Sequence, residues 1–341
     1  MPAIKPKPKT ANPMKALRAR LSDAGVKKGF LDKVVLPSWW EDSLAETTGG
    51  FREAAAYICA HLGYGLACLL DGRAKLEFSQ QGAVKFKKAK GVSEDDVCLT
   101  THYALGVARA VAGGFSEHVA VHAVPAPEAW REALLAKAAT QWVTLKDILQ
   151  ATWKLGIPVV HVRNIPAGAK KPDALTTMVG DRPVIVVMNG RKSPSWVAFI
   201  VAHELGHIHH KHLKAGQTLV DEKIGEKSDE KDEGDANDFA AKLLTGSSDL
   251  GLSSPRSMGI PQLAAAAKSF GGKYRVSPGV AALNYASNTG EWAVANGAVA
   301  ALEANEDAAE DMNAALLENV GTDDFSEDAW EWICRATSGV K

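Results

Sequence analysis

Residues 193–212, which read SPSWVAFIVAHELGHIHHKH, constrain the fold more than any other stretch of the chain. Ser193 is a favourable helix N-cap and Pro194 suits the first helical position, so we expect a long helix to begin here. Side chains four residues apart lie on one face of a helix, which directs His203 and His207 at a common point. Because the rest of the helix is apolar, the pair indicates a buried metal site rather than a solvated helix end.

The pattern His-Glu-x-x-His also predicts a chemistry. His203 and His207 can bind one zinc ion at Zn–N distances of about 2.0 Å. Glu204 is rotated from His203 by about 100 degrees and is expected to face a metal-bound water instead of coordinating the ion. Zinc lowers the pKa of such a water towards 7, and a neighbouring carboxylate can then take its proton. The pattern therefore predicts a catalytic metal site with Glu204 as the base.

The remaining histidines of this stretch do not complete the site. His210 shares the face of His207, but a straight helix carries it about 4.5 Å further along the axis. His209 and His212 are rotated away from that face, and we expect them to be solvated or to contact the acidic residues that follow. A catalytic zinc site uses three protein ligands and one open position, so the third ligand must come from elsewhere.

A second predicted helix, within DEKDEGDANDFAAKLLTG at residues 229–246, offers that ligand. Glu233 shares the apolar face of this helix and is the best-placed carboxylate, with Glu230 and Asp232 as competitors. Asn237 lies one turn further on the same side, where it can hydrogen-bond a ligand histidine and fix its tautomer. Two histidines and one glutamate would hold zinc, and also manganese.

Around these motifs the sequence predicts an α+β protein that is mostly helical. A helix, a strand at 158–162 and a strand pair within 174–188 precede the motif helix. Helical patterns with glycine stops fill the chain on either side. Four regions are expected. Residues 1–13 form a disordered basic tail, and residues 14–138 form a helical region that resembles a helix-turn-helix module. Residues 139–250 form a metallopeptidase-like core, and residues 251–341 form a C-terminal helical region.

Three further segments near the core carry expectations of their own. The run VIVVM at 184–188 is predicted to be an edge strand that pairs with an extended substrate. Residues 219–235 are predicted to be a loop, either an exposed connector or a lid. VKFKKAKG at 84–91 is predicted to be a solvated connector, with a phosphate or acidic-peptide contact as the alternative.

Charge and cysteine content limit the class of protein. The net charge of −1 gives no general attraction to nucleic acid or an anionic membrane. Residues 1–35 nevertheless carry nine Lys or Arg against two acidic residues. DNA binding by the N-terminal helices, with a structural or metal-sensing zinc site, therefore stays an alternative. Four scattered cysteines indicate thiols in a reducing compartment, and no run is apolar enough for a signal peptide or membrane span. We expect a cytoplasmic protein without a membrane partner.

Together, VAHELGH and EGDANDFAAKLL, about 26 residues apart, resemble the ImmA/IrrE family of metallopeptidases over residues 140–250. The resemblance implies a gluzincin-like zinc fold with a small zincin-like core. It implies that His203, His207 and Glu233 bind zinc and that Glu204 is the base. It also implies intracellular cleavage of a protein partner, typically a helix-turn-helix repressor of stress or mobile-element genes. A toxin–antitoxin or phage-associated module that recognises without cutting is a further alternative.

Two segments depart from the pattern of that family. WVAFIV at 196–201 replaces an Arg-Phe-Thr-Leu type of entry, and Thr245-Gly246 replaces the usual Met-Pro. Both lie near the expected path of a substrate. Peptide hydrolysis also needs a donor for the developing oxyanion, and the sequence leaves Tyr274, Tyr285 and Arg256 as open alternatives.

Overall fold

The structure, a computed structural model, describes residues 12–79, 83–87, 94–115, 119–221, 231–254 and 256–337. Within these residues it is a mostly helical α+β fold built around a five-stranded sheet, which confirms the predicted class. Most of the predicted tail, the second half of the 84–91 segment and Glu230 lie outside the described residues.

The sheet is mixed, and its strands follow the order β1-β5-β3-β4-β2. β3 and β4 form an antiparallel hairpin that turns at Gly180, whose φ of 60° favours glycine. β5 is antiparallel to β3, while β1 and β2 are parallel to their neighbours β5 and β4. The strands are β1 (Ala83–Lys87), β2 (Val159–His161), β3 (Ala174–Val179), β4 (Arg182–Val187) and β5 (Gln217–Asp221).

Three local expectations are wrong. The VIVVM run is β4, which lies between β3 and β2 and is therefore not an edge open to a substrate. The predicted 219–235 loop is wrong at its two ends, since residues 219–221 belong to β5 and residues 231–235 to a helix, while residues 222–230 lie outside the described residues. The start of the 84–91 segment is β1, paired with β5 in the register Ala83↔Gln217. The pairing of β1 with β5 joins residues more than a hundred positions apart, so local sequence carries little signal of it.

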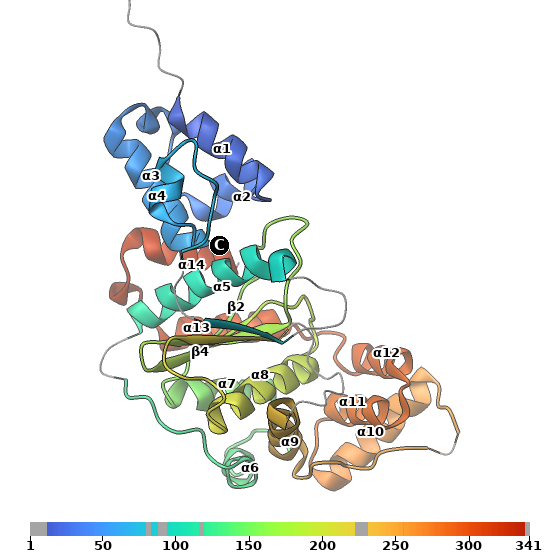
Figure 1. Ribbon diagram of the computed structural model, residues 1–341. Helices are drawn as coiled ribbons and strands as arrows, with labels where there is room; N and C mark the ends of the chain where they lie inside the picture. Colours follow the sequence, from blue (N-terminus) through green and yellow to red (C-terminus); the bar gives the residue numbers. More distant parts are fainter. Residues whose placement is uncertain are drawn as a thin grey trace, which may run out of the picture.

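Helices cover both faces of the sheet (Figure 1). α5 packs on β3 and β4 from one face, and α8 packs on the same strands from the other, beside α7. α9 runs along α8 and is in turn covered by α6. α13 packs on α7 and β2. These helices are α5 (Glu94–Gly114), α6 (Pro127–Leu135), α7 (Leu145–Lys154), α8 (Pro194–His209), α9 (Lys231–Thr245) and α13 (Ala308–Asn319).

Two further groups of helices lie at opposite ends of this body (Figure 1). One group contains the N-terminal elements and is joined by α14, which packs on η1 and α5. Its members are α1 (Pro13–Asp23), α2 (Lys28–Phe30), η1 (Leu31–Val35), η2 (Asp42–Glu46), α3 (Thr48–Leu62), α4 (Leu66–Leu70) and α14 (Glu327–Thr337). The other group packs beside α8 and consists of α10 (Ile260–Tyr274), α11 (Pro278–Thr289) and α12 (Trp292–Leu302). In the first group, a short 3-10 turn, η3 (Thr322–Asp324), precedes α14.

The predicted regions 14–138, 139–250 and 251–341 all contribute to the sheet and the layers around it, since β1 and α5 come from 14–138 and α13 from 251–341. The domain boundaries remain a prediction. In the described part of the chain, no helix has both the length and the apolar character needed to cross a bilayer.

Candidate metal centre

The helix that carries the histidine pair begins as its sequence predicts. The Ser193 hydroxyl accepts a hydrogen bond from the Trp196 backbone N–H at 3.2 Å, and Pro194 occupies the first turn. The helix is buried along nearly its whole length between the sheet and α9. A Cβ atom at Gly206 would lie 2.8 Å from the Ala236 Cα, so glycine is needed where α8 and α9 approach each other.

Three of the predicted site residues meet in this interior. The Nε2 atoms of His203 and His207 lie 3.0 Å apart. Each Nε2 is 3.4 Å from a carboxylate oxygen of Glu233 on α9. Both histidines are fully buried, and the Glu233 side chain is 13% exposed. Four ligands at 2.0–2.2 Å in a tetrahedron lie about 3.3 Å from one another, so these donor atoms fit the spacing of a zinc site.

Contacts of the outer ring nitrogens turn both histidines inward. Asn237 Oδ1 accepts a hydrogen bond from His203 Nδ1 at 3.0 Å, as expected for this asparagine. On the other histidine, His207 Nδ1 lies 2.8 Å from His212 Nδ1. Such contacts fix the tautomer of a metal-binding histidine and present Nε2 to the ion. Asp232, a competitor for the third ligand, instead lies 3.7 Å from His212 Nε2.

The contact made by His212 differs from the expectation. α8 ends at His209, and Lys211 adopts a left-handed φ of 59° that reverses the chain. The reversal returns His212 to His207, and only 9% of its side chain is exposed. The prediction that His212 is rotated away was wrong because it continued the helix past its end, although the expected contact with an acidic residue is present.

The other two histidines lie outside the cluster. His209 Nδ1 donates to the Val124 carbonyl at 2.9 Å and its ring packs on Phe239, so the expectation of a solvated side chain is wrong. His210 is exposed and lies beside the ring of His212. Helical geometry therefore predicted correctly that His210 is not one of the three clustered residues.

Glu204, the predicted base, is fully buried next to the histidines. The Thr176 hydroxyl on β3 donates to its Oε2 atom. Thr176 is itself fully buried in the middle of the sheet. Thr176 was not among the predicted site residues; its only signal in the sequence is the pair of polar residues, Thr176 and Thr177, between apolar residues of β3.

Two of the three oxyanion candidates already have other contacts. The Tyr285 hydroxyl donates to Glu291 Oε2 at 2.7 Å, which raises the pKa of the tyrosine together with burial. Tyr274 is half exposed on α10, where its ring packs against Phe270. The third, Arg256, is exposed. The structure therefore gives no contact that would choose one of them as the donor.

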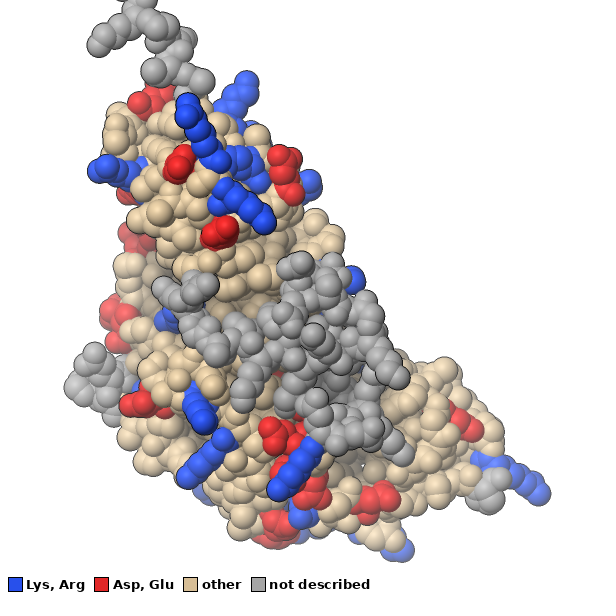
Figure 2. Space-filling view, viewed as in Figure 1, with Lys and Arg blue, Asp and Glu red and all other residues tan. Residues whose placement is uncertain are grey.

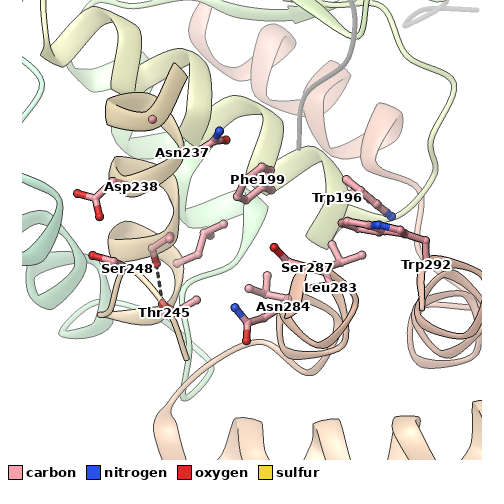
Figure 3. Close-up of a pocket in the computed structure, with 14 residues that line it drawn as sticks. Trp196, Phe199, Asn237, Asp238, Thr245, Ser248, Leu283, Asn284, Ser287 and Trp292 are labelled. Carbon is pink, nitrogen blue, oxygen red and sulfur yellow. Dashed lines mark hydrogen bonds between the residues drawn. The ribbon is translucent and has the colours of Figure 1, made fainter. Parts of the chain in front are cut away.

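A cavity of about 350 Å³ lies beside the cluster, and Figure 3 shows the residues that line it. Asn237 lies in the cavity wall and contacts His203 of the cluster, and the Phe199 ring lies 6.5 Å from the His203 ring. The two segments that depart from the family pattern both reach this cavity. The lining residues are Trp196, Phe199, Gly234, Asn237, Asp238, Ala241, Leu244, Thr245, Ser248, Val280, Leu283, Asn284, Ser287 and Trp292.

Two histidines from one helix and a glutamate from the next, beside a buried second glutamate, form the arrangement of a metallopeptidase-type hydrolase. Residues 132–284 match the Peptidase_M78 family, described as the IrrE N-terminal-like domain. This match confirms the resemblance to the ImmA/IrrE family for that segment and implies a divalent metal at the His-His-Glu cluster. No curated protein gives a significant match to the chain.

Proposed function

We propose that the protein is a zinc-dependent endopeptidase that cleaves an intracellular protein partner, a helix-turn-helix transcriptional repressor, in the cytoplasm. The observation that supports it most is the convergence of three side chains in a buried site: the Nε2 atoms of His203 and His207 lie 3.0 Å apart, and each is 3.4 Å from one of the two Glu233 carboxylate oxygens. The family match supports the reaction class. The identity of the substrate is a proposal from the resemblance alone.

The donor set favours zinc over manganese. Two imidazoles and one carboxylate at tetrahedral spacing suit zinc, whereas manganese prefers oxygen ligands in an octahedral arrangement. In this proposal His203, His207 and Glu233 hold the ion. Asn237 and His212 hold the two histidines in the correct tautomers from outside.

In the proposed reaction the chain supplies the base and its orientation. Zinc bound at such a site lowers the pKa of water and polarises a carbonyl group. Glu204 takes a proton from the attacking water and passes it to the leaving amine. The Thr176 hydroxyl fixes the direction of the Glu204 carboxylate. Burial of Glu204 away from bulk water strengthens each of these electrostatic interactions.

Replacing Glu204 by glutamine tests the proposal, because the amide keeps the shape of the side chain and loses its basicity. We expect Glu204→Gln to bind one equivalent of zinc and to slow cleavage by at least about 100-fold, the usual effect of losing a general base. The substrate is the helix-turn-helix protein encoded nearest to the gene, co-expressed and followed by immunoblot. Glu318→Gln, on the exposed surface of α13, is the matched control and should cleave normally. Undiminished cleavage by Glu204→Gln would overturn the assignment.

The N-terminal region gives little support to the DNA-binding alternative. Lys and Arg alternate with Asp and Glu on the face of these helices that Figure 2 shows. Arg18 pairs with Asp32 and Asp42 at 2.6 and 2.7 Å. Arg20 donates to the carbonyls of residues 68 and 74. Both arginines are thus held by internal contacts. Site-specific binding of the full chain to duplex DNA, weakening steeply with salt, would restore this alternative.

A further inference from the structure

The cavity beside the cluster has the size and lining of a binding pocket. Its volume of about 350 Å³ falls within the range of pockets that hold small organic groups. Most of its wall is apolar and comes from α8, α9, α11 and α12, so it lies where the helix that carries the histidines meets the C-terminal group of helices (Figure 3).

One wall of this cavity is held rigidly. The rings of Trp196 and Trp292 stack with their centroids 5.8 Å apart. Trp196 Nε1 donates to Asn296 Oδ1 at 3.0 Å, and the Arg191 guanidinium lies 4.1 Å from the centre of the Trp196 ring. Leu283 projects towards these rings from α11 (Figure 3). A wall fixed in this way loses little conformational entropy when a ligand binds.

The cavity lies next to the cluster. Phe199 precedes His203 by one helical turn, and Gly234 directly follows Glu233. Asn237 contacts His203 from the cavity wall. A polypeptide whose carbonyl lies at the cluster would therefore place a neighbouring side chain at the cavity.

The lining also indicates the chemistry of that side chain. The one charged residue among the lining residues is Asp238, and its carboxylate is 2.9 Å from the Lys242 ammonium group. A charged side chain entering the cavity would lose water without gaining an unpaired partner of opposite charge. The aromatic and aliphatic wall offers an apolar ring favourable contacts instead.

We propose that this cavity is the specificity pocket of the enzyme and takes an apolar side chain, preferably aromatic, next to the scissile bond. The inference rests on the proposed function, because the pocket has this role only if the cluster binds zinc. Sequence specificity of cleavage is then set mainly by contacts to α8 and α11.

Two hydroxamates separate the pocket from the metal. Acetohydroxamate reports the zinc site alone, and 3-phenylpropanohydroxamate adds a benzyl group that reaches the cavity. Isothermal titration of the zinc-loaded protein should show at least about tenfold tighter binding of the phenyl compound, because the ring is buried. Filling the cavity with Leu283→Trp should bring the ratio of the two affinities close to one.

Two more variants test whether a change in this ratio comes from filling the cavity. Ser287 is exposed at the cavity, so Ser287→Trp should fold even if Leu283→Trp does not, and it should reduce the same ratio. Leu317→Trp, on the exposed surface of α13, is the matched control and should keep the wild-type ratio. If zinc-loaded wild-type protein fails to bind acetohydroxamate, the proposed function is overturned. If it binds both compounds equally, or if the two cavity variants keep the wild-type ratio, only the pocket is overturned.

Discussion

Buried histidines occur in two very different settings in this molecule. In the N-terminal helices, His61 donates from Nδ1 to the Val35 carbonyl at 2.6 Å, and its ring stacks on Trp332 with centroids 3.8 Å apart. Burial lowers the pKa of His61 to about 4. In the core, the Nε2 atoms of His203 and His207 face each other and a carboxylate. Burial of histidine therefore does not define a metal site; convergence of donor atoms does.

The first prediction separates the two settings by their effect on zinc. We expect His203→Ala to weaken zinc binding by more than about 100-fold, since a direct ligand contributes more than the outer contacts that typically contribute 10–100-fold. His61→Ala should keep one equivalent of zinc at wild-type affinity. Competition with a chromophoric chelator measures both. Equal losses of zinc affinity in the two variants would contradict the assignment of His203 as a zinc ligand and of His61 as a structural histidine.

The second prediction uses pH to show that His61 is structural. The pKa of His61 is about 4 in the folded protein and about 6.5 when unfolded, so the unfolded state binds more protons between these values. The contribution of neutral, buried His61 to the free energy of unfolding is therefore fully present above about pH 6.5 and is lost as pH falls towards 4. The loss is about 2 kcal/mol between about pH 7 and pH 5.

Urea unfolding with a chelator present, so that zinc binding does not contribute, measures this change in the free energy of unfolding. His61→Gln should lack this part of the pH dependence. His102, whose pKa burial also lowers to about 4, titrates in both proteins and cancels. The same pH dependence in the variant and the wild type would show that His61 does not carry it.

The third prediction concerns the contacts that hold the cluster from outside. Asn237→Ala and His212→Ala should each weaken zinc binding by about 10–100-fold, because the ligand histidine loses the partner that fixes its tautomer. His210→Ala is the matched control, since His210 is exposed and lies outside the cluster. An effect of His210→Ala as large as that of His212→Ala would contradict the assignment of His212.

The smallest expected effect concerns the orientation of the base. Thr176→Val removes the hydroxyl that donates to Glu204 and should lower kcat about tenfold with zinc affinity unchanged. Thr177→Val is the matched control, because the Thr177 hydroxyl pairs with Thr218 instead. A loss of kcat in both variants would point to general damage to the strand rather than to the contact with Glu204.

Much of the candidate site follows from local sequence because its parts lie on two helices with clear patterns. The Ser193 cap, the apolar face of α8 and the four-residue spacing predicted where His203 and His207 would point. The apolar face of α9 likewise predicted that Glu233 and Asn237 would turn inward. These predictions depend only on helical geometry and burial.

What the sequence did not reveal depends on contacts between distant segments or on where a helix ends. The pairing of β1 with β5 and the interior position of β4 follow from the arrangement of the whole sheet. The contact of Thr176 with Glu204 joins residues 28 positions apart. The return of His212 to the cluster depends on the left-handed backbone conformation of Lys211. Lysine rarely adopts this conformation, so its presence in the sequence does not predict a turn.

Anomalous diffraction at the zinc edge, from crystals of the purified full chain, tests the central claim most directly. The account predicts a peak about 2.0–2.2 Å from His203 Nε2, His207 Nε2 and a carboxylate oxygen of Glu233. It predicts that Glu204 does not coordinate the ion. Zinc bound by other residues, or a zinc-saturated crystal without a peak at this cluster, would contradict it.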